Sequence, residues 1–319
     1  MPSASEISER IAHESDRRRR LSVPAFAGGV LYLLSGIIIS ETLKGAPTVG
    51  LLQGIEPAFS GVVDPAVSPR AAEVRFISPH ALPLISGSVL AGIAIGALTL
   101  VLLLLVDATR FRRPESWSGT RPLVLFGGVA VALVSIGHQV LSAILTHKFL
   151  VGHDFSGHAV ELALTKGTAN TLSDYLDLVA GLALAGGMIT TMIGAMRVGL
   201  LTRWVGVLGI FTGVLIFLPI GGATLEVIPA FWMVAMGMLY AERWPSGDPP
   251  AWTSGQARPW PTRADQRAAA AAAAGGEAPA GAGVDLGAPP ALPGAGNGSS
   301  SGKRKRRRGA RSGEGQRPE

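Results

Sequence analysis

The sequence predicts an all-α membrane protein, a polytopic bundle of transmembrane helices. Long apolar stretches occupy most of the first 242 residues, and 48% of the 319-residue chain is hydrophobic. A bilayer core is about 30 Å thick, so a helix needs about 20 apolar residues to cross it. Barrel strands are excluded because they alternate polar and apolar residues over about 10 positions. Charged residues make up only 16% of the chain, against about 25% in soluble domains.

Six apolar stretches form the predicted transmembrane domain, residues 23–242. They are 23–39, 82–106, 122–145, 175–196, 204–220 and 227–242. The sixth is the least typical, because it is short and contains Pro229 near its start. The fifth and sixth are also compatible with a tight hairpin through Gly221 and Gly222.

The N-terminal segment, residues 1–22, is predicted to be basic and cytoplasmic. Its run Arg17–Arg20 directly precedes the first apolar stretch, as in a secretory signal peptide. The residues that follow that stretch, from Ser40 onward, lack the small-x-small cleavage pattern. We therefore expect the first stretch to remain as a membrane anchor.

Arginine is concentrated in alternate connections, which indicates the orientation. Arg17–Arg20, the segment 110–121, the turn 197–203 and the residues after 242 carry most of it. Lys and Arg favour the cytoplasmic side of short loops. The pattern predicts six helices with both termini in the cytoplasm.

The segment 243–263 is rich in Pro and Trp and follows the last predicted helix directly. Trp244, Trp252 and Trp260 recur every eight residues. Trp is enriched at membrane interfaces, so the three residues are expected to lie along the inner headgroup layer. The alternative is that they form a docking strip for a cytoplasmic partner.

The tail, residues 264–319, is predicted to be disordered because its Gly, Pro, Ala and Ser low complexity cannot bury a core. A polybasic run near its end is predicted to bind anionic lipid headgroups, at roughly 1 kcal/mol per residue. The run consists of Lys303, Arg304, Lys305, Arg306, Arg307 and Arg308. Aromatic residues do not interleave with it, so a specific nucleic-acid partner is not predicted.

Polar residues inside the third stretch are candidates for a transport pathway. Ser135, His138 and Ser142 share one helix face, with Gln139 beside them. Intramembrane polar residues usually face the bundle interior. They either contact a substrate or proton, together with Asp177, or form hydrogen bonds that fix packing. For Asp177 the alternative is helix capping at the start of the fourth stretch.

Four histidines are predicted to lie on the outer side of the membrane. They are His80, His147, His153 and His158. Imidazole groups bind Zn²⁺ or Cu²⁺ and titrate near neutral pH. The spacing matches no standard ligand motif, so metal binding, pH sensing and simple solvation all remain open.

The sequence contains no cysteine, which excludes disulfides, iron–sulfur clusters and thiol nucleophiles. Phosphate-binding loops, nucleophile elbows and zinc-protease motifs are also absent, so no cofactor is predicted. The leading hypothesis is a non-enzymatic structural or interaction protein whose partners are the lipid bilayer and a second copy or another membrane protein. The alternatives are a small transporter or channel and an extracytoplasmic metal- or pH-responsive sensor.

The C-terminal part of the membrane domain resembles an uncharacterised actinobacterial family of multi-pass membrane proteins. The resemblance covers residues 175–262 and is carried by Arg203-Trp-Val-Gly-Val-Leu-Gly-Ile, Phe231-Trp and the string Pro-Pro-Ala-Trp to Pro-Trp-Pro at 249–261. It implies a bacterial source, and hence the bacterial cytoplasmic membrane. It implies no activity.

Overall fold

The computed structural model describes residues 4–47, 68, 70–152, 156–162, 164, 167–218, 226–245, 247–260, 267–268 and 270–272. Every regular element among these residues is a helix, which confirms the predicted all-α class for this part of the chain. These helices are α1 Ala4–Leu43, α3 Ala71–Ile77, η1 Ser78–His80, α4 Ala81–Arg112, α5 Thr120–Gly152, α6 Gly157–Glu161, α7 Thr168–Val198, α8 Arg203–Phe217, α9 Val227–Tyr240 and α10 Pro250–Ser254. All belong to one compact unit, Met1–Arg263. Within the predicted disordered tail, residues 264–319, the described residues 267–268 and 270–272 are helical. The polybasic run Lys303–Arg308 lies outside the described residues.

Four segments are helical, long and apolar enough to cross a membrane. They are Ser5–Leu43, Ala71–Arg112, Thr120–Gly152 and Thr168–Val198. α8 and α9 are apolar but only 15 and 14 residues long. At 1.5 Å per residue they rise about 22 and 21 Å, short of a core of roughly 30 Å. In the described structure, four of the six predicted transmembrane stretches therefore belong to helices long enough to cross a bilayer. The other two belong to the shorter helices at 203–217 and 227–240.

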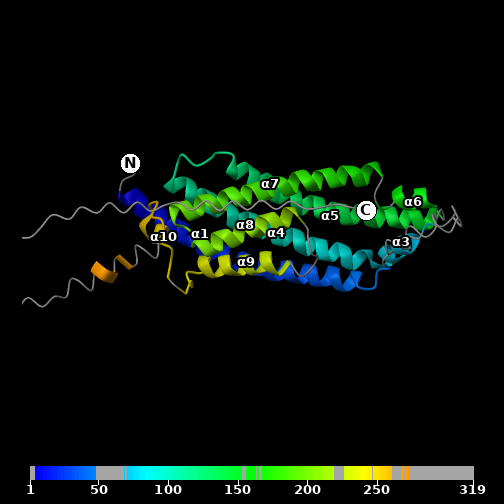
Figure 1. Ribbon diagram of the computed structural model, residues 1–319, viewed down its shortest axis with the longest axis horizontal. Coiled ribbons are helices and arrows are strands. Elements are labelled where there is room, and N and C mark those ends of the chain that lie inside the picture. The colour runs from blue at the N-terminus through cyan, green and yellow to red at the C-terminus, as the bar shows by residue number, and fades with distance from the viewer. Residues whose placement is uncertain are drawn as a thin grey trace, which may run out of the picture. The chain divides into compact units, whose positions relative to one another are not determined.

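α4 lies at the centre of the bundle, in contact with α1, α5 and α7. α9 packs on α1, and α8 packs between α7 and α9. Figure 1 shows the long helices running side by side, with α3 and α6 near one end and α10 near the other. The buried residues of α4 include a nearly continuous apolar run, Val101–Val106, of which five members are at most 2% exposed.

α1 begins 19 residues before the predicted start of its apolar stretch and continues through Pro24. Residues 4–22 are therefore helical and continuous with the first apolar stretch, which the apolar pattern alone did not predict. The reason is a face with i, i+4, i+7 and i+11 spacing, formed by Ile7, Ile11, Glu14 and Arg18. Glu14 and Arg18 are buried, and the two isoleucines reach Gly255 just beyond α10.

Glycines allow α5 and α7 to approach closely. A methyl group at Gly127 would lie 2.3 Å from the backbone nitrogen of Leu184, and one at Gly187 would lie 2.9 Å from the Val124 side chain. Such distances exclude any larger residue without separation of the helices. The contact fixes the depth at which the polar residues of α5 and α7 face each other.

Candidate functional site

The predicted polar stripe of α5 makes a polar contact with α7 through His138. Its Nδ1 lies 3.1 Å from Ser173 Oγ and 4.0 Å from a carboxylate oxygen of Asp174. The hydroxyl of Ser135 instead donates to Ala132 O within α5. Ser142 accepts a hydrogen bond from Thr146 at its backbone carbonyl. The stripe is thus only partly assembled into an interhelical contact, with Gln139 half-buried beside it.

The capping interpretation of Asp177 is wrong. α7 begins at Thr168, with Gly167 as its N-cap, so Asp177 lies in the third turn. The sequence concealed this start, because residues 168–174 are polar and resemble a loop. Asp177 is exposed on the helix surface and lies within electrostatic range of His138. His138, Ser173, Asp174 and Asp177 therefore form one polar cluster, shared by two spanning helices.

The predicted outer histidines occupy separate environments. His80 stacks on Phe76, with ring centroids 4.2 Å apart, and its Nδ1 lies 2.7 Å from Phe76 O. His147 is exposed near the end of α5, and His158 is exposed on α6. His153 lies outside the described residues. Among those that are described, no three His, Cys, Asp or Glu side chains are grouped to hold a metal ion.

The opposite end of the bundle contains a buried ion pair that joins α1 and α4. Arg112 Nη2 donates to Glu14 Oε2 at 2.8 Å, and the two side chains are 0% and 4% exposed. Arg112 also donates through Nε to Ala251 O and through Nη1 to Ala108 O, at 3.0 and 2.9 Å. These bonds engage each guanidinium nitrogen, which is what burial of a cation requires.

A second buried arginine attaches the segment after α9 to α1. Arg18 donates through Nη1 and Nη2 to the two carboxylate oxygens of Asp248, both at 3.2 Å. Its Nη2 also donates to Leu239 O at 2.7 Å. Its guanidinium lies 4.5 Å from the ring centroid of Trp252. Bidentate geometry fixes orientation as well as distance, so Leu239, Asp248 and Trp252 are held in one arrangement around Arg18.

Trp252 is a core residue, and the prediction that it anchors the chain in the headgroup layer is wrong. It is 3% exposed, and its Nε1 donates to Leu200 O at 3.0 Å. The Arg18 and Arg112 guanidinium groups lie 4.5 and 5.3 Å from its ring. We call Glu14, Arg18, Arg112, Asp248 and Trp252 the arginine cluster.

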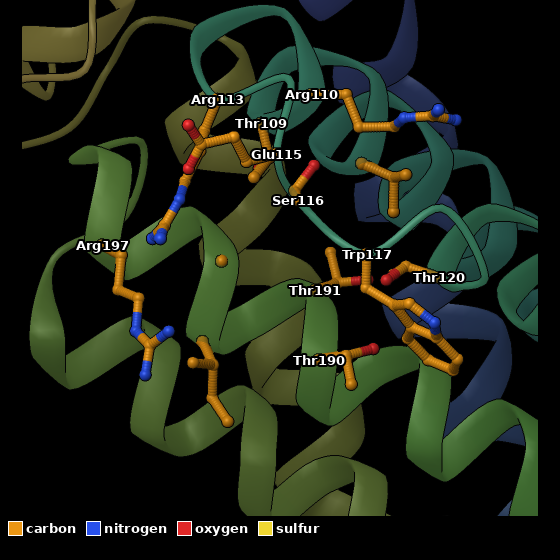
Figure 2. A pocket seen from close by; sticks show the side chains of 13 residues that line it. Thr109, Arg110, Arg113, Glu115, Ser116, Trp117, Thr120, Thr190, Thr191 and Arg197 are labelled. Carbon is orange, nitrogen blue, oxygen red and sulfur yellow. The ribbon is translucent and has the colours of Figure 1, made fainter.

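A pocket of about 260 Å³ opens beside the arginine cluster, between the ends of α4 and α7 and the start of α5. Figure 2 shows Arg113 and Arg197 extending along one margin, Trp117 on the opposite margin, and Arg110 directed away. The full lining is Val106, Thr109, Arg110, Arg113, Glu115, Ser116, Trp117, Thr120, Thr190, Thr191, Ile193, Gly194 and Arg197.

Sequence reasoning treated every arginine at this end as a topological signal. It therefore missed both the arginine cluster and the pocket. The helical spacing of Glu14 and Arg18 was a usable signal for the first, because it places a carboxylate and a guanidinium on one face of α1. For Arg112 the sequence holds no signal that separates it from Arg110 and Arg113.

No family model matches this sequence, and neither a curated protein nor a solved structure matches it. The resemblance of residues 175–262 to an actinobacterial family therefore stays a prediction.

Proposed function

We propose that the chain is a non-enzymatic interaction protein of the bacterial cytoplasmic membrane. Its working surface is the arginine-rich end of the bundle, by which we mean residues 4–20, 107–121, 197–203, 241–245 and 247–260. Both termini of the compact unit lie in the cytoplasm in this proposal, as the distribution of arginine predicts. The chain crosses the membrane either six times, or four times with α8 and α9 as a re-entrant pair that enters and leaves on one side. Both topologies place the two termini in the cytoplasm, because α8 begins and α9 ends at the arginine-rich end.

The observation that carries the proposal is the arginine cluster. Arginines that only set the orientation of the protein in the membrane do not need a fixed structure. Burying the two guanidinium groups of the cluster costs several kcal/mol each in lost hydration. The cost is offset here by ion pairs and hydrogen bonds that hold α10 against α1 and α4. The result is a folded surface outside the apolar stretches, and a fixed surface serves binding.

Site-specific cross-linking tests the proposal in membranes of a bacterial host. A photo-reactive residue at Ser254, on the arginine-rich end, is expected to yield discrete cross-linked products. The matched position is Gly152, exposed at the opposite end and free of neighbours within 4 Å of an added Cβ. Trp252→Ala, which removes the ring that both arginines contact, should abolish the products at Ser254. Equal products at both positions, or products that persist in Trp252→Ala, contradict the proposal.

A small transporter is the second candidate, favoured by the contact of His138 with Ser173 and Asp174 across two spanning helices. The two proposed functions predict different proton fluxes, which can be measured in reconstituted vesicles loaded with a pH-sensitive dye. The interaction proposal expects proton leak equal to that of empty vesicles, for wild type and for His138→Ala alike. A leak that exceeds the empty control and disappears in His138→Ala and Asp177→Asn would favour transport.

A further inference from the structure

The pocket beside the arginine cluster contains buried hydroxyl groups with no partner. Thr109 is 5% exposed, and its Oγ1 forms no hydrogen bond within the described part of the chain. Ser116 Oγ is also buried and forms no hydrogen bond with a described residue. Buried hydroxyls usually find a partner, and leaving one unsatisfied costs about 1–3 kcal/mol. Both residues line the pocket, so a group bound there can satisfy each hydroxyl once its side chain rotates toward the pocket.

Thr109 differs in this respect from other helical threonines of the chain. Thr99, Thr191 and Thr212 each donate to the carbonyl oxygen four residues earlier. Thr109 does not, although it lies inside α4. A Cβ at Gly194 would lie 3.1 Å from its methyl carbon, so the methyl group faces α7.

Three arginines of the lining carry charge that the described chain does not neutralise. Arg110, Arg113 and Arg197 are exposed and form no ion pair with another described residue. Other arginines at this end, such as Arg17 and Arg121, both pair with Asp107. One carboxylate, Glu115, also lines the pocket.

The balance of charge favours an anion. Arg110 is directed away from the pocket (Figure 2), so Arg113, Arg197 and Glu115 give a net +1 from the lining. α4 and α7 present C-terminal ends and α5 an N-terminal end, which together contribute about −0.5. A positive balance of about +0.5 remains.

We propose that the pocket binds a phosphate group, with Arg113 and Arg197 as its charge partners and the hydroxyls of Thr109 and Ser116 as further donors. The planar guanidinium fork suits a tetrahedral oxoanion. The volume of 260 Å³ lies just below the range of about 300–1,000 Å³ typical of drug-sized ligands. A phosphate with a small substituent fits that size. The phosphate belongs either to a lipid headgroup, whose glycerol would lie against Trp117, or to a soluble anion.

Calorimetric titration of the purified full-length chain in a neutral detergent tests this site. The probes are inorganic phosphate, dihexanoyl phosphatidic acid and dihexanoyl phosphatidylcholine. We expect saturable binding of at least one of the first two. Arg113→Gln and Arg197→Gln should each weaken it roughly tenfold, the effect of losing one charge-assisted contact. Arg243→Gln is the control, because Arg243 is exposed at the same end but does not line the pocket.

Two further variants separate binding from folding. Glu115→Gln removes the one carboxylate of the lining and should tighten binding about threefold, by the charge argument. Thr109→Val removes an unpartnered buried hydroxyl, so it should raise the thermal midpoint while weakening binding several-fold. A purely structural role for these residues leaves the affinity unchanged in both variants.

The pattern of affinities identifies the source of the phosphate. Phosphatidic acid binding much more tightly than inorganic phosphate supports the site and assigns it to a lipid. Equal affinities support the site and assign it to a soluble anion. No saturable binding of either probe overturns the proposal, as does an Arg243→Gln loss equal to those of Arg113→Gln and Arg197→Gln.

Discussion

Arg112 illustrates how burial divides chemically identical residues into different roles. Its side chain is 0% exposed and paired with Glu14, whereas Arg110 and Arg113, two and one positions away, are exposed. Helical geometry accounts for the difference, since neighbouring positions are about 100° apart around the axis. From the sequence alone, all three arginines are expected in a loop. Only the packing of α1 on α4 distinguishes the buried Arg112 from the exposed Arg110 and Arg113.

Removing one member of the Arg112–Glu14 pair should destabilise the protein strongly. Arg112→Met removes the buried cation of Glu14, which keeps only its 3.3 Å ion pair with the part-exposed Arg10. Breaking a buried pair of this kind costs about 3–5 kcal/mol. We expect a marked fall in the thermal midpoint, measured by tryptophan fluorescence in detergent. Arg110→Met is the control, because Arg110 is exposed and unpaired in the described structure; it should change the midpoint little.

The double variant Arg112→Met with Glu14→Gln gives the sharper test. It removes both charges, and replacing a buried ion pair by neutral groups is often tolerated. We expect it to recover a large part of the stability lost in Arg112→Met. Additive losses in the double variant would show that the two residues act independently.

Glu242 makes this end of the bundle sensitive to acid. It lies beyond the end of α9 and accepts hydrogen bonds from Arg19 and Ser15, at 2.9 and 2.8 Å. The bond from Arg19, foremost, lowers the pKa of the Glu242 carboxyl below its ordinary value, and that from Ser15 acts in the same direction.

A lowered pKa means that Glu242 stabilises the folded state fully above the unfolded value, about 4.3. The contribution is lost as the pH falls through the lower, folded-state pKa. Wild type should therefore lose more stability than Glu242→Gln between pH 5 and pH 3, by the thermal midpoint. Parallel pH profiles for the two proteins would contradict this assignment.

At the scale of elements, the start of a helix was harder to predict than its middle. The predicted ranges 82–106 and 122–145 lie inside α4 and α5, because apolar residues report burial in lipid. α1 and α7 begin 19 and seven residues before their predicted starts, since their first turns are polar. Lipid dictates the apolar pattern, but a polar helix end is held by contacts that hydropathy does not record.

Close packing of α5 on α7 depends on Gly127, which faces α7, and not on glycines of α5 that point outward. Gly127→Ala would place a methyl group 2.3 Å from Leu184 N, so the helices must separate. Overpacking of this kind costs about 1–3 kcal/mol. We expect a lower thermal midpoint and weaker His138–Ser173 contact, the latter read from the imidazole chemical shifts.

Gly137→Ala is the matched control for that experiment. It makes the same chemical change on the same helix, where an added Cβ meets nothing within 4 Å. Alanine also has the better helix propensity, so the midpoint should stay unchanged or rise slightly. A loss equal to that of Gly127→Ala would mean that general helix effects, rather than the α5–α7 contact, set the outcome.

At the scale of the whole molecule, hydropathy and charge pattern account for the bundle and its two unlike ends. Four long apolar helices follow from composition, and the concentration of arginine at one end follows from residues 17–20, 110–121 and 197–203. The arginine cluster and the pocket do not follow, because each joins residues more than 70 positions apart. Such pairs are chosen by tertiary packing, and a single sequence carries no trace of which arginine meets which carboxylate.

The depth reached by α8 decides between six crossings and four. Phe217, its last residue, packs near Gly181 of α7. α7 continues for 13 residues beyond that point, from Gly181 back to Thr168, which is about 20 Å of helix. We therefore expect Leu218, immediately after α8, to lie below the outer surface, as in a re-entrant pair.

Cysteine labelling measures this depth directly, because the chain contains no cysteine of its own. Single variants Leu218→Cys, Gly152→Cys and Ser254→Cys are treated in intact cells with a membrane-impermeant maleimide. Gly152→Cys should react from outside, and Ser254→Cys only after the membrane is opened. Leu218→Cys should stay unlabelled from outside, because about 22 Å of α8 does not cross a core of roughly 30 Å. Rapid labelling of Leu218→Cys from outside would instead establish α8 as a full crossing and restore the count of six.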